Sequence, residues 1–284
     1  EESYPDGATL PELVLNGDYE ELSSDLILNG DFASGVSNWG LYQTGSSTVT
    51  FPDVASINID GSNNNVGLFQ ENVFTNAKTY KIVLTMKATA NFIAEVLESQ
   101  GAVTVSSIGQ VSLTTSYQDF TFYFKATGTN DLFIHRLFGQ TAGQNQQILI
   151  KNVLVKESDP NDRWTLGTGW TISGGKANFD ASAASTFSYL TQASILPSPL
   201  PLDYELTFTL SDLGGSFSYS NAGIVRNGSV RSFQTLGLSA PGTHTIIVTE
   251  TSSSNFSFFG HPNSDDFSID NVSIKEYAIQ PLDI

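Results

Sequence analysis

The chain has 284 residues, with 12 lysines and arginines against 29 aspartates and glutamates, which gives a formal net charge of −17. Phosphate binding needs clustered basic side chains, so this balance argues against a nucleic-acid partner. The chain contains no cysteine, which excludes disulfides, thiolate nucleophiles and cysteine-ligated zinc. Hydrophobic residues make up 39% of the sequence, enough to bury a core in about two domains. No apolar run reaches the roughly 20 residues of a membrane-spanning helix, so no membrane partner is expected.

The chain begins with a proline-containing arm, residues 1–11, which is followed by a short repeat. The sequence LVLNGDY at residues 13–19 recurs thirteen residues later as LILNGDF at residues 26–32. The second copy leads directly into Gly35 and Trp39. We interpret each copy as the opening strand of a folded unit.

Alternating apolar and polar residues then recur along the chain, and this period of two predicts β-strands rather than helices. In chain order, the alternation covers residues 80–87, 120–125, 204–210 and 246–248 and continues at 256–258. Turn-forming clusters separate these runs. Many short strands with one polar side indicate β-sandwiches.

The second half of the chain repeats the first. The run TYKIVLT at residues 79–85 corresponds to DYELTFT at residues 203–209. The segment ILIKNVLVKE at residues 148–157 corresponds to FSIDNVSIKE at residues 267–276. With Trp39 and Trp170 taken as equivalent, the chain contains two sandwiches of one plan.

The first half has one opening strand to spare, and the second half has none before Trp164. The economical interpretation is nesting, in which residues 12–22 open an outer sandwich, residues 25–157 form an inserted inner one, and residues 159–277 complete the outer one. Insertions are tolerated where termini lie close together. Two alternatives remain open: the spare strand pairs with another copy of the chain, or it is a surface duplication.

Residues 28–39, with the sequence LNGDF followed by Gly35 and Trp39, resemble the start of jelly-roll carbohydrate-binding modules. These belong to the galactose-binding-like superfamily, which includes families four, nine, sixteen and twenty-two. Their final strand commonly reads I-D-N-V, as residues 269–272 do here, whereas Lys151 replaces the acid in the first copy. Residues 164–177 together with IDNVSIKEY at residues 269–277 look like a version found in structural proteins of tailed phages. The resemblance implies two jelly-roll sandwich domains. The repeats indicate that one is inserted in the other, and residues 278–284, which lie outside both repeats, form a C-terminal arm.

The resemblance also implies one structural Ca²⁺ where the first and last strands of such a module meet. In the outer sandwich its ligands would be Asp18, Glu20 and Asp270, because Ca²⁺ takes oxygen ligands. In the inner sandwich Lys151 opposes a cation. The alternative for Asp18 and Asp270 is turn capping by their side chains. No other cofactor is expected.

Glycan binding in such modules implies exposed aromatic rings beside polar side chains. The candidates here are Tyr42, Gln70, Tyr123, His135 and Arg136, which lie at or between strands of the inner sandwich. Buried packing or an intersubunit contact is the alternative for each of them.

The sequence contains no H-E-x-x-H, nucleophile-elbow or P-loop motif. The neighbouring carboxylates of Glu95 and Glu98 are expected to solvate an edge or turn. The expected function is a non-catalytic structural protein on the surface of a phage virion, a capsid decoration, head-fibre or tail-associated protein, whose partners are virion proteins or copies of itself. The alternative is an extracellular pair of glycan-binding modules, in an adsorption apparatus or a secreted polysaccharide-degrading enzyme, which contacts a cell-surface glycan.

Overall fold

The computed structural model describes residues 11–61, 66–137, 146–197, 202–213, 218–226, 228–251 and 254–277. Across these ranges the secondary structure consists of β-strands and a 3₁₀ turn at Ala181–Ala183, as the alternation predicted. No helix in this part of the chain is long and apolar enough to cross a membrane. The expected C-terminal arm, residues 278–284, lies outside the described residues, as does the N-terminal arm except for Pro11.

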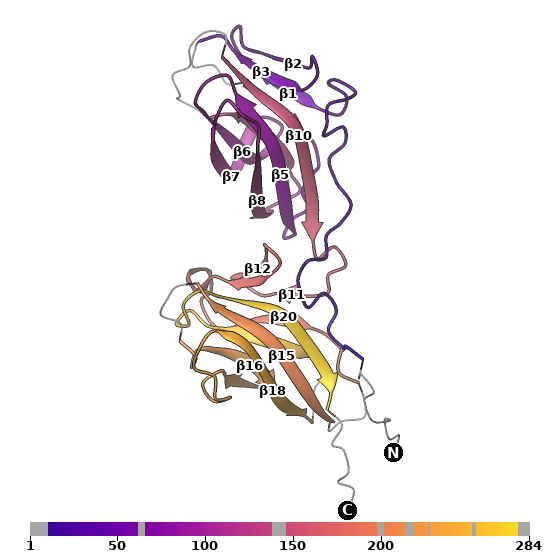
Figure 1. Cartoon of the computed structure of the whole chain (residues 1–284), viewed down its shortest axis with the longest axis vertical. Coiled ribbons are helices and arrows are strands. Elements are labelled where there is room, and N and C mark those ends of the chain that lie inside the picture. Colours follow the sequence, from indigo (N-terminus) through magenta and orange to yellow (C-terminus); the bar gives the residue numbers. More distant parts are fainter. Residues whose placement is uncertain are drawn as a thin grey trace, which may run out of the picture. The chain divides into compact units, whose positions relative to one another are not determined.

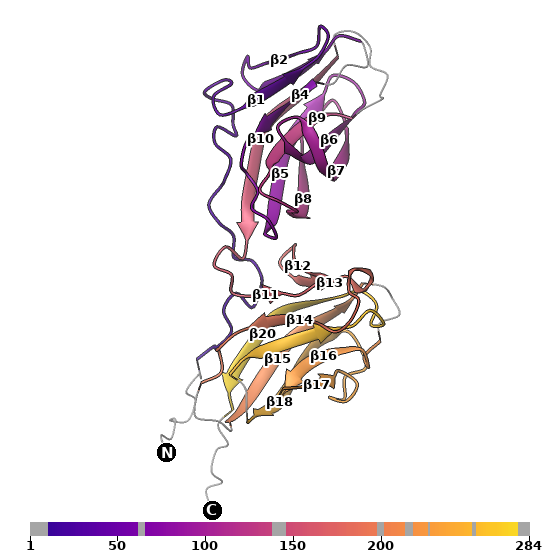
Figure 2. The same cartoon turned by 180° about the vertical axis from the view of Figure 1, so that it is seen from behind.

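The chain divides into two compact units. We call residues 22–158 the inner unit, and residues 1–21 together with 159–284 the outer unit. Each unit is a sandwich of two five-stranded antiparallel sheets (Figures 1 and 2). The expected all-β, jelly-roll fold class is therefore confirmed.

In the inner unit the first sheet has the order β1-β4-β9-β6-β7 and the second sheet has the order β2-β3-β10-β5-β8. The strands are β1 Gly40–Gln43, β2 Thr48–Thr50, β3 Ala55–Ile59, β4 Val66–Gln70, β5 Thr79–Ala88, β6 Phe92–Gln100, β7 Val103–Leu113, β8 Gln118–Lys125, β9 Asp131–Arg136 and β10 Gln146–Ser158.

In the outer unit the first sheet has the order β11-β14-β19-β16-β17 and the second sheet has the order β12-β13-β20-β15-β18. The strands are β11 Thr165–Leu166, β12 Trp170–Ile172, β13 Ala177–Phe179, β14 Ser188–Gln192, β15 Leu202–Asp212, β16 Ala222–Arg226, β17 Ser229–Ser232, β18 Gly242–Glu250, β19 Phe256–Gly260 and β20 Phe267–Glu276. The strand order is that of the inner unit, so the sequence repeat is also a repeat of topology.

Each core lies between its two sheets, because the strands alternate apolar and polar residues. On β5, Tyr80, Ile82 and Leu84 are buried in the core of the inner unit, and the residues between them face outward. Tyr204, Leu206 and Phe208 of β15 are likewise buried in the core of the outer unit. Burial of such apolar surface contributes roughly 25 cal/mol per Å² and is the main favourable term for both sandwiches.

Residues 12–21, which we call the outer clasp, close the outer unit along the second half of β20. The N–H of Leu13 donates to the carbonyl of Ile274 (2.9 Å), and the N–H of Val272 donates to the carbonyl of Gly17 (2.8 Å). The clasp is not the opening strand that we expected from the repeat, because Asn16 and Tyr19 adopt left-handed backbone conformations (φ 52° and 54°) that turn the chain.

Residues 25–34, the inner clasp, make the same bonds in the inner unit. The N–H of Leu26 donates to the carbonyl of Val155 (2.8 Å), and the N–H of Val153 donates to the carbonyl of Gly30 (3.0 Å). The two copies of the short repeat therefore hold the equivalent halves of β10 and β20.

Each clasp also receives a hydrogen bond from a buried tryptophan, and this corrects the predicted equivalence of Trp39 and Trp170. The indole N–H of Trp39 donates to the carbonyl of Asn29, and that of Trp164 donates to the carbonyl of Asn16, both at 3.0 Å. Trp170 instead lies wholly in the core of the outer unit. The equivalent of Trp39 is thus Trp164, six residues before the tryptophan that the spacing suggested.

Adding one methyl group to a clasp glycine should destabilise one unit at a time. A Cβ on Gly17 would lie 2.0 Å from the carbonyl oxygen of Val272, and one on Gly30 would lie 2.2 Å from that of Val153. We expect Gly17→Ala to lower the stability of the outer unit by about 1–3 kcal/mol, and Gly30→Ala to do the same to the inner unit. Hydrogen exchange read by mass spectrometry would assign each effect to its unit. Equal loss of protection in both units for either variant would contradict the prediction.

Candidate functional site

The outward side of the first sheet carries aromatic side chains in both units. In the inner unit the ring of Phe133 on β9 lies edge-on to Tyr42 (6.0 Å between centroids) and to Phe69 (6.3 Å). It also stacks on His135, at 4.9 Å and 10° between ring planes. Leu132 and Ile134, which alternate with Phe133 and His135 along β9, point the other way and belong to the core.

Two glycines allow this packing. A Cβ on Gly40 would lie 2.3 Å from the ring of Phe69, and one on Gly67 would lie 2.7 Å from the ring of Phe133. The rings therefore occupy space that side chains on β1 and β4 would otherwise fill. Side chains at these positions would displace the rings from the sheet.

His135 is fully buried within this aromatic layer and pairs with Glu95 on β6, with 3.2 Å between Nε2 and Oε2. Burial lowers the pKa of the imidazole, and the nearby Glu95 carboxylate opposes that shift. The other carboxylate oxygen of Glu95 accepts hydrogen bonds from Ser107 and Gln110, each at 3.0 Å. The result is a polar group with several donors and acceptors inside an aromatic surface.

The five predicted glycan ligands do not share one site. Tyr42 and His135 lie on the face just described. Gln70 is buried, and its side-chain amide bonds both the N–H and the carbonyl of Leu28, each at 2.9 Å, so it supports the inner clasp. Arg136 is buried at the end of β9, whereas Tyr123 is exposed on β8 of the second sheet.

Glu95 and Glu98 are both buried, so the prediction that they solvate an edge or turn is wrong. The carboxylate of Glu98 accepts hydrogen bonds from the N–H and hydroxyl of Thr127 (2.9 and 2.6 Å), from the Asn130 amide (2.8 Å) and from the Ser106 hydroxyl (2.8 Å). It thereby holds the loop between β8 and β9 against β6. Sequence alone could not indicate this role, because the donors lie up to 32 residues away.

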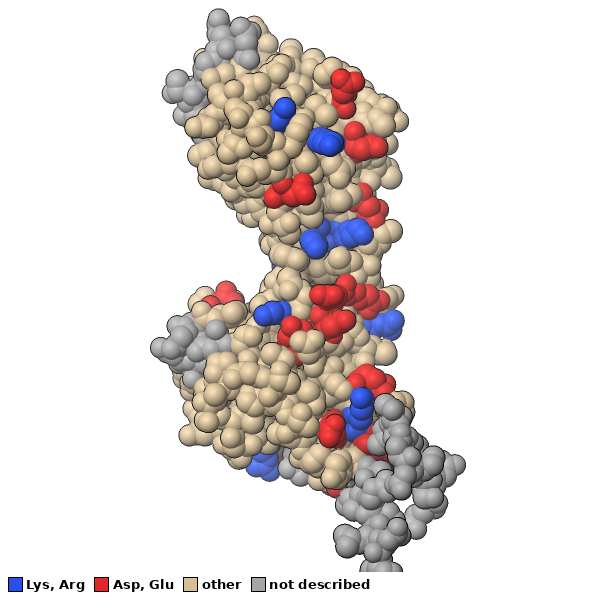
Figure 3. All heavy atoms as spheres, in the orientation of Figure 1, with Lys and Arg blue, Asp and Glu red and all other residues tan. Residues whose placement is uncertain are grey.

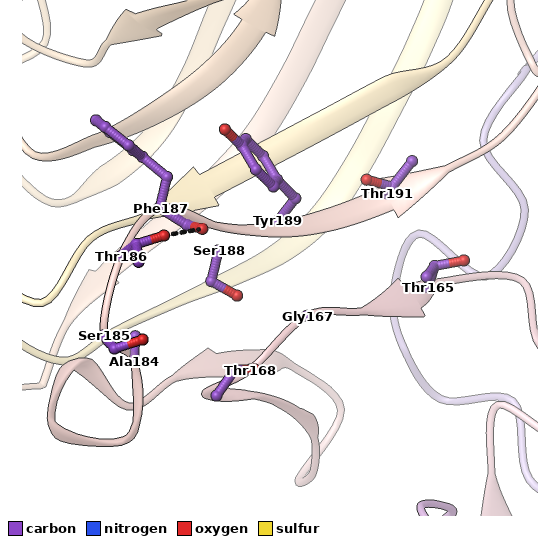
Figure 4. Close-up of a pocket in the computed structure, with 10 residues that line it drawn as sticks. All are labelled: Thr165, Gly167, Thr168, Ala184, Ser185, Thr186, Phe187, Ser188, Tyr189 and Thr191. Carbon is purple, nitrogen blue, oxygen red and sulfur yellow. Dashed lines mark hydrogen bonds between the residues drawn. The ribbon is translucent and has the colours of Figure 1, made fainter.

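The outer unit has a pocket of about 300 Å³ on the equivalent face (Figure 4). Its walls come from β11, β14 and the segments beside them. The lining residues are Thr165, Gly167, Thr168, Ala184, Ser185, Thr186, Phe187, Ser188, Tyr189 and Thr191. This volume is at the lower end of the range for small-molecule sites.

Two exposed rings stand beside this pocket. Phe187 is 46% exposed and Tyr189 is 40% exposed, although both lie on the same sheet face as buried Phe259. Phe187 is held by contacts with the rings of Phe259 (5.6 Å) and His261 (4.8 Å). In Figure 4 the rings of Phe187 and Tyr189 lie on one side of β14, and Ser188 points to the other side, toward Gly167.

The chemistry of the pocket is neutral and rich in hydroxyl groups. None of its lining residues is charged, and seven of the side chains carry a hydroxyl. Among the described residues, Ser188 Oγ is buried without a hydrogen-bond partner, which is uncommon for a buried polar atom. A Cβ on Gly167 would lie 2.5 Å from this oxygen, so the glycine leaves room beside it. An uncharged ligand that both donates and accepts hydrogen bonds fits such a lining.

The sequence prediction missed this pocket. The segment STFSYLTQ at residues 185–192 alternates aromatic and hydroxyl residues, which identifies a strand but not which of its sides is open. The predicted glycan ligands all lie on the inner sandwich.

The predicted calcium ligands do not come together. In the part of the chain that the structure describes, no three His, Asp or Glu side chains are grouped so as to hold a metal ion. Asp18 accepts a hydrogen bond from the N–H of Glu20 (3.4 Å), and Asp270 accepts one from the N–H of Asn271 (2.7 Å). Calcium binding by these residues stays a prediction.

No protein-family model matches the chain, and no curated protein matches its sequence. Similar solved structures include the second N-terminal cellulose-binding domain of Cellulomonas fimi β-1,4-glucanase C, with 21% identity over 48% of this chain and 95% of that one, and a TM-score of 0.36. A CBM4 carbohydrate-binding module is 17% identical over 45% of this chain and 99% of its own, with a TM-score of 0.38. The enzymatically active domain of bacteriophage CBA120 tailspike protein 4 is 16% identical over 47% of this chain and 21% of its own, with a TM-score of 0.37.

Replacing Glu98 by glutamine should weaken the inner unit at neutral pH and reduce its sensitivity to acid. Burial raises the pKa of this carboxyl, but the hydrogen bonds from Thr127, Asn130 and Ser106 outweigh burial and hold it below its ordinary value of 4.5. A depressed pKa contributes stability that is present above 4.5 and lost as the pH falls through the folded-state pKa. We expect Glu98→Gln to cost about 1–3 kcal/mol at pH 7, and the cost to shrink below pH 4.5.

Denaturant unfolding between pH 7 and pH 3 would measure this effect, with exposed Glu71→Gln as the control. A pH-independent difference between Glu98→Gln and the wild type would contradict the assignment.

Proposed function

We propose that the protein is a non-catalytic carbohydrate-binding protein and that its outer-unit pocket takes a neutral sugar. The observation that supports this is the combination of two exposed rings, Phe187 and Tyr189, with an uncharged, hydroxyl-lined pocket of about 300 Å³. Leaving large aromatic rings in water forgoes the free energy of burying them, and an exposed apolar patch rimmed by polar residues is a mark of a binding site.

The physical match is between a sugar ring and this lining. A pyranose has an apolar C–H face that stacks on an aromatic ring, and a rim of hydroxyls that each donate and accept hydrogen bonds. Threonine and serine hydroxyls also do both, since each has one donor and two acceptor sites. The hydroxyls of Thr165, Thr168 and Thr191 line the pocket and supply such donors and acceptors.

An anionic ligand suits the pocket less well. No lysine or arginine lines it, so a carboxylate or phosphate would lose its hydration without gaining a charge-assisted hydrogen bond. The proposal therefore commits to neutral hexose or pentose units rather than to uronic acids or phosphorylated sugars.

Removing either exposed ring should weaken binding to neutral polysaccharides. We expect Tyr189→Ala and Phe187→Ala each to raise the Kd about tenfold, which corresponds to a loss of about 1.4 kcal/mol of stacking and burial. Isothermal titration calorimetry against soluble glucans, mannans and xylans would measure the change. Tyr277→Ala is the matched control, because that tyrosine is 43% exposed in the same unit but lies outside the pocket.

The proposal fails if no neutral polysaccharide binds, or if binding survives loss of both rings. Release of reducing ends from a bound polysaccharide by the intact protein would overturn the non-catalytic part of the proposal and leave the binding part standing.

We further propose that the protein lies on the surface of a phage virion. The resemblance of residues 164–177 and 269–277 to phage structural modules supports this location. A surface or extracellular place suits a chain that binds glycans. Mass spectrometry of purified particles, combined with antibody labelling of intact ones, would test it. Absence of the chain from particles would favour the secreted glycan-binding alternative.

A further inference from the structure

The outward faces of the two second sheets carry opposite charges. In the inner unit the face formed by β5, β8 and β10 carries five lysines and one carboxylate: Lys81, Lys87, Lys125, Lys151, Lys156 and Asp119. The whole chain has 12 lysines and arginines, so this concentration on one face is notable against a net charge of −17.

The same face of the outer unit, formed by β15, β18 and β20, is acidic. Its charged side chains are Asp203, Glu205 and Asp270, with Lys275 as the one basic group among the described residues of these strands that alternate away from the core. Figure 3 shows blue side chains over β5 and β10 of the inner unit and red ones over β15 and β20 of the outer unit.

Two of these differences occur at equivalent positions of the repeat. Lys81 on β5 corresponds to Glu205 on β15. Each lies opposite the last strand of its unit, β10 or β20, which we call the closing strand. Lys151 corresponds to Asp270, and each lies at a β-bulge of its closing strand, where the register against the neighbouring strand shifts. The two second sheets thus share a strand order and carry opposite charges at these two positions.

Neighbouring side chains on each face influence how these charges are presented. Tyr117 holds two lysines at the surface, with the Lys87 ammonium 4.6 Å and the Lys151 ammonium 5.9 Å from its ring centroid. On the acidic face short threonines pair across β15 and β18, with 2.9 Å between the hydroxyls of Thr207 and Thr245. Short side chains at these positions allow another surface to approach closely.

We propose that these faces bind each other between copies of the chain, so that the inner unit's second sheet of one copy docks on the outer unit's second sheet of the next. Because the two faces differ, a contact made in one direction is heterologous and generates rings or linear chains, whereas two such contacts made reciprocally between the same two copies close a two-fold dimer. The occupant is a second copy because the acidic partner surface is present in the same molecule, with the same strand order and matching charges. The contact lies on the sheets opposite to the proposed sugar pocket, so it leaves that pocket open.

The strength of this contact depends on salt. Single exposed ion pairs contribute about 0–1 kcal/mol, so the association needs several pairs acting together. The Debye length falls from about 30 Å at 0.01 M salt to about 3 Å at 1 M. Association between copies should therefore be strong at about 0.01 M salt and lost at about 1 M salt.

Sedimentation velocity of the full chain, with two charge-reversed variants, tests the proposal. In the first variant, Lys81→Glu with Lys151→Asp, each lysine is replaced by the residue of the equivalent position, which the same backbone already accommodates. In the second, Glu205→Lys with Asp270→Lys, the reversal is made on the other face. The wild type should form concentration-dependent oligomers at about 0.01 M salt and sediment as a monomer at about 1 M.

Each variant alone should remain monomeric at low salt. The first leaves three lysines against three carboxylates on the inner face, which is then no longer basic, and the second makes both faces basic. An equal mixture of the two should associate again, because each supplies the face that the other lost. A wild type that stays monomeric at low salt and high concentration would overturn the proposal, as would variants that associate like the wild type. Loss of heparin binding by the first variant, with a monomeric wild type, would assign the lysine face to an anionic polysaccharide instead.

Discussion

The hydrogen bonds between each clasp and its closing strand are the constraint on which both sandwiches depend. In the outer unit β13 pairs with β20 only from Phe267 to Ile269, so the backbone groups beyond that point need another partner on that side. The outer clasp supplies it through bonds to Val272 and Ile274. Buried backbone groups without partners cost free energy comparable to a lost hydrogen bond, so a sandwich without its clasp is incomplete.

This dependence explains why the outer unit is built from two separated segments. Its clasp precedes the inner unit in sequence, and everything else in it follows the inner unit. The N–H of Ile274 also bonds the side chain of Glu12 (2.7 Å), just as the N–H of Val155 bonds Asp25 (3.0 Å). The two clasps therefore share the carboxylate at their first position, Glu12 in one and Asp25 in the other. The outer clasp, which contains the first copy of the short repeat, bonds β20, and the inner clasp, which contains the second copy, bonds β10.

The two units use a shared architecture for different surfaces. The first sheet of the inner unit fills its outward face with packed rings and a buried pair of Glu95 and His135, whereas the first sheet of the outer unit leaves Phe187 and Tyr189 beside an open pocket. A duplicated core can tolerate such divergence because outward positions contribute little to stability. Function in this protein is therefore a property of individual faces rather than of the fold.

The sequence by itself determined the β-sandwich class and the repeat, because alternation along a strand dictates which side chains enter the core, and the recurrence of LNGD and of the closing strand is readable without coordinates. The sequence also suggested that one sandwich is inserted in the other, because the first half has one opening element too many, at residues 13–19, and the second half has none. Only the tertiary structure decided that Trp164 rather than Trp170 matches Trp39, since that match rests on a hydrogen bond to a clasp and not on spacing. It also decided that His135 and Arg136 are buried while Phe187 and Tyr189 are exposed. Period-two alternation separates the two sides of a strand, but how completely an outward side is covered depends on neighbours that are distant in the sequence.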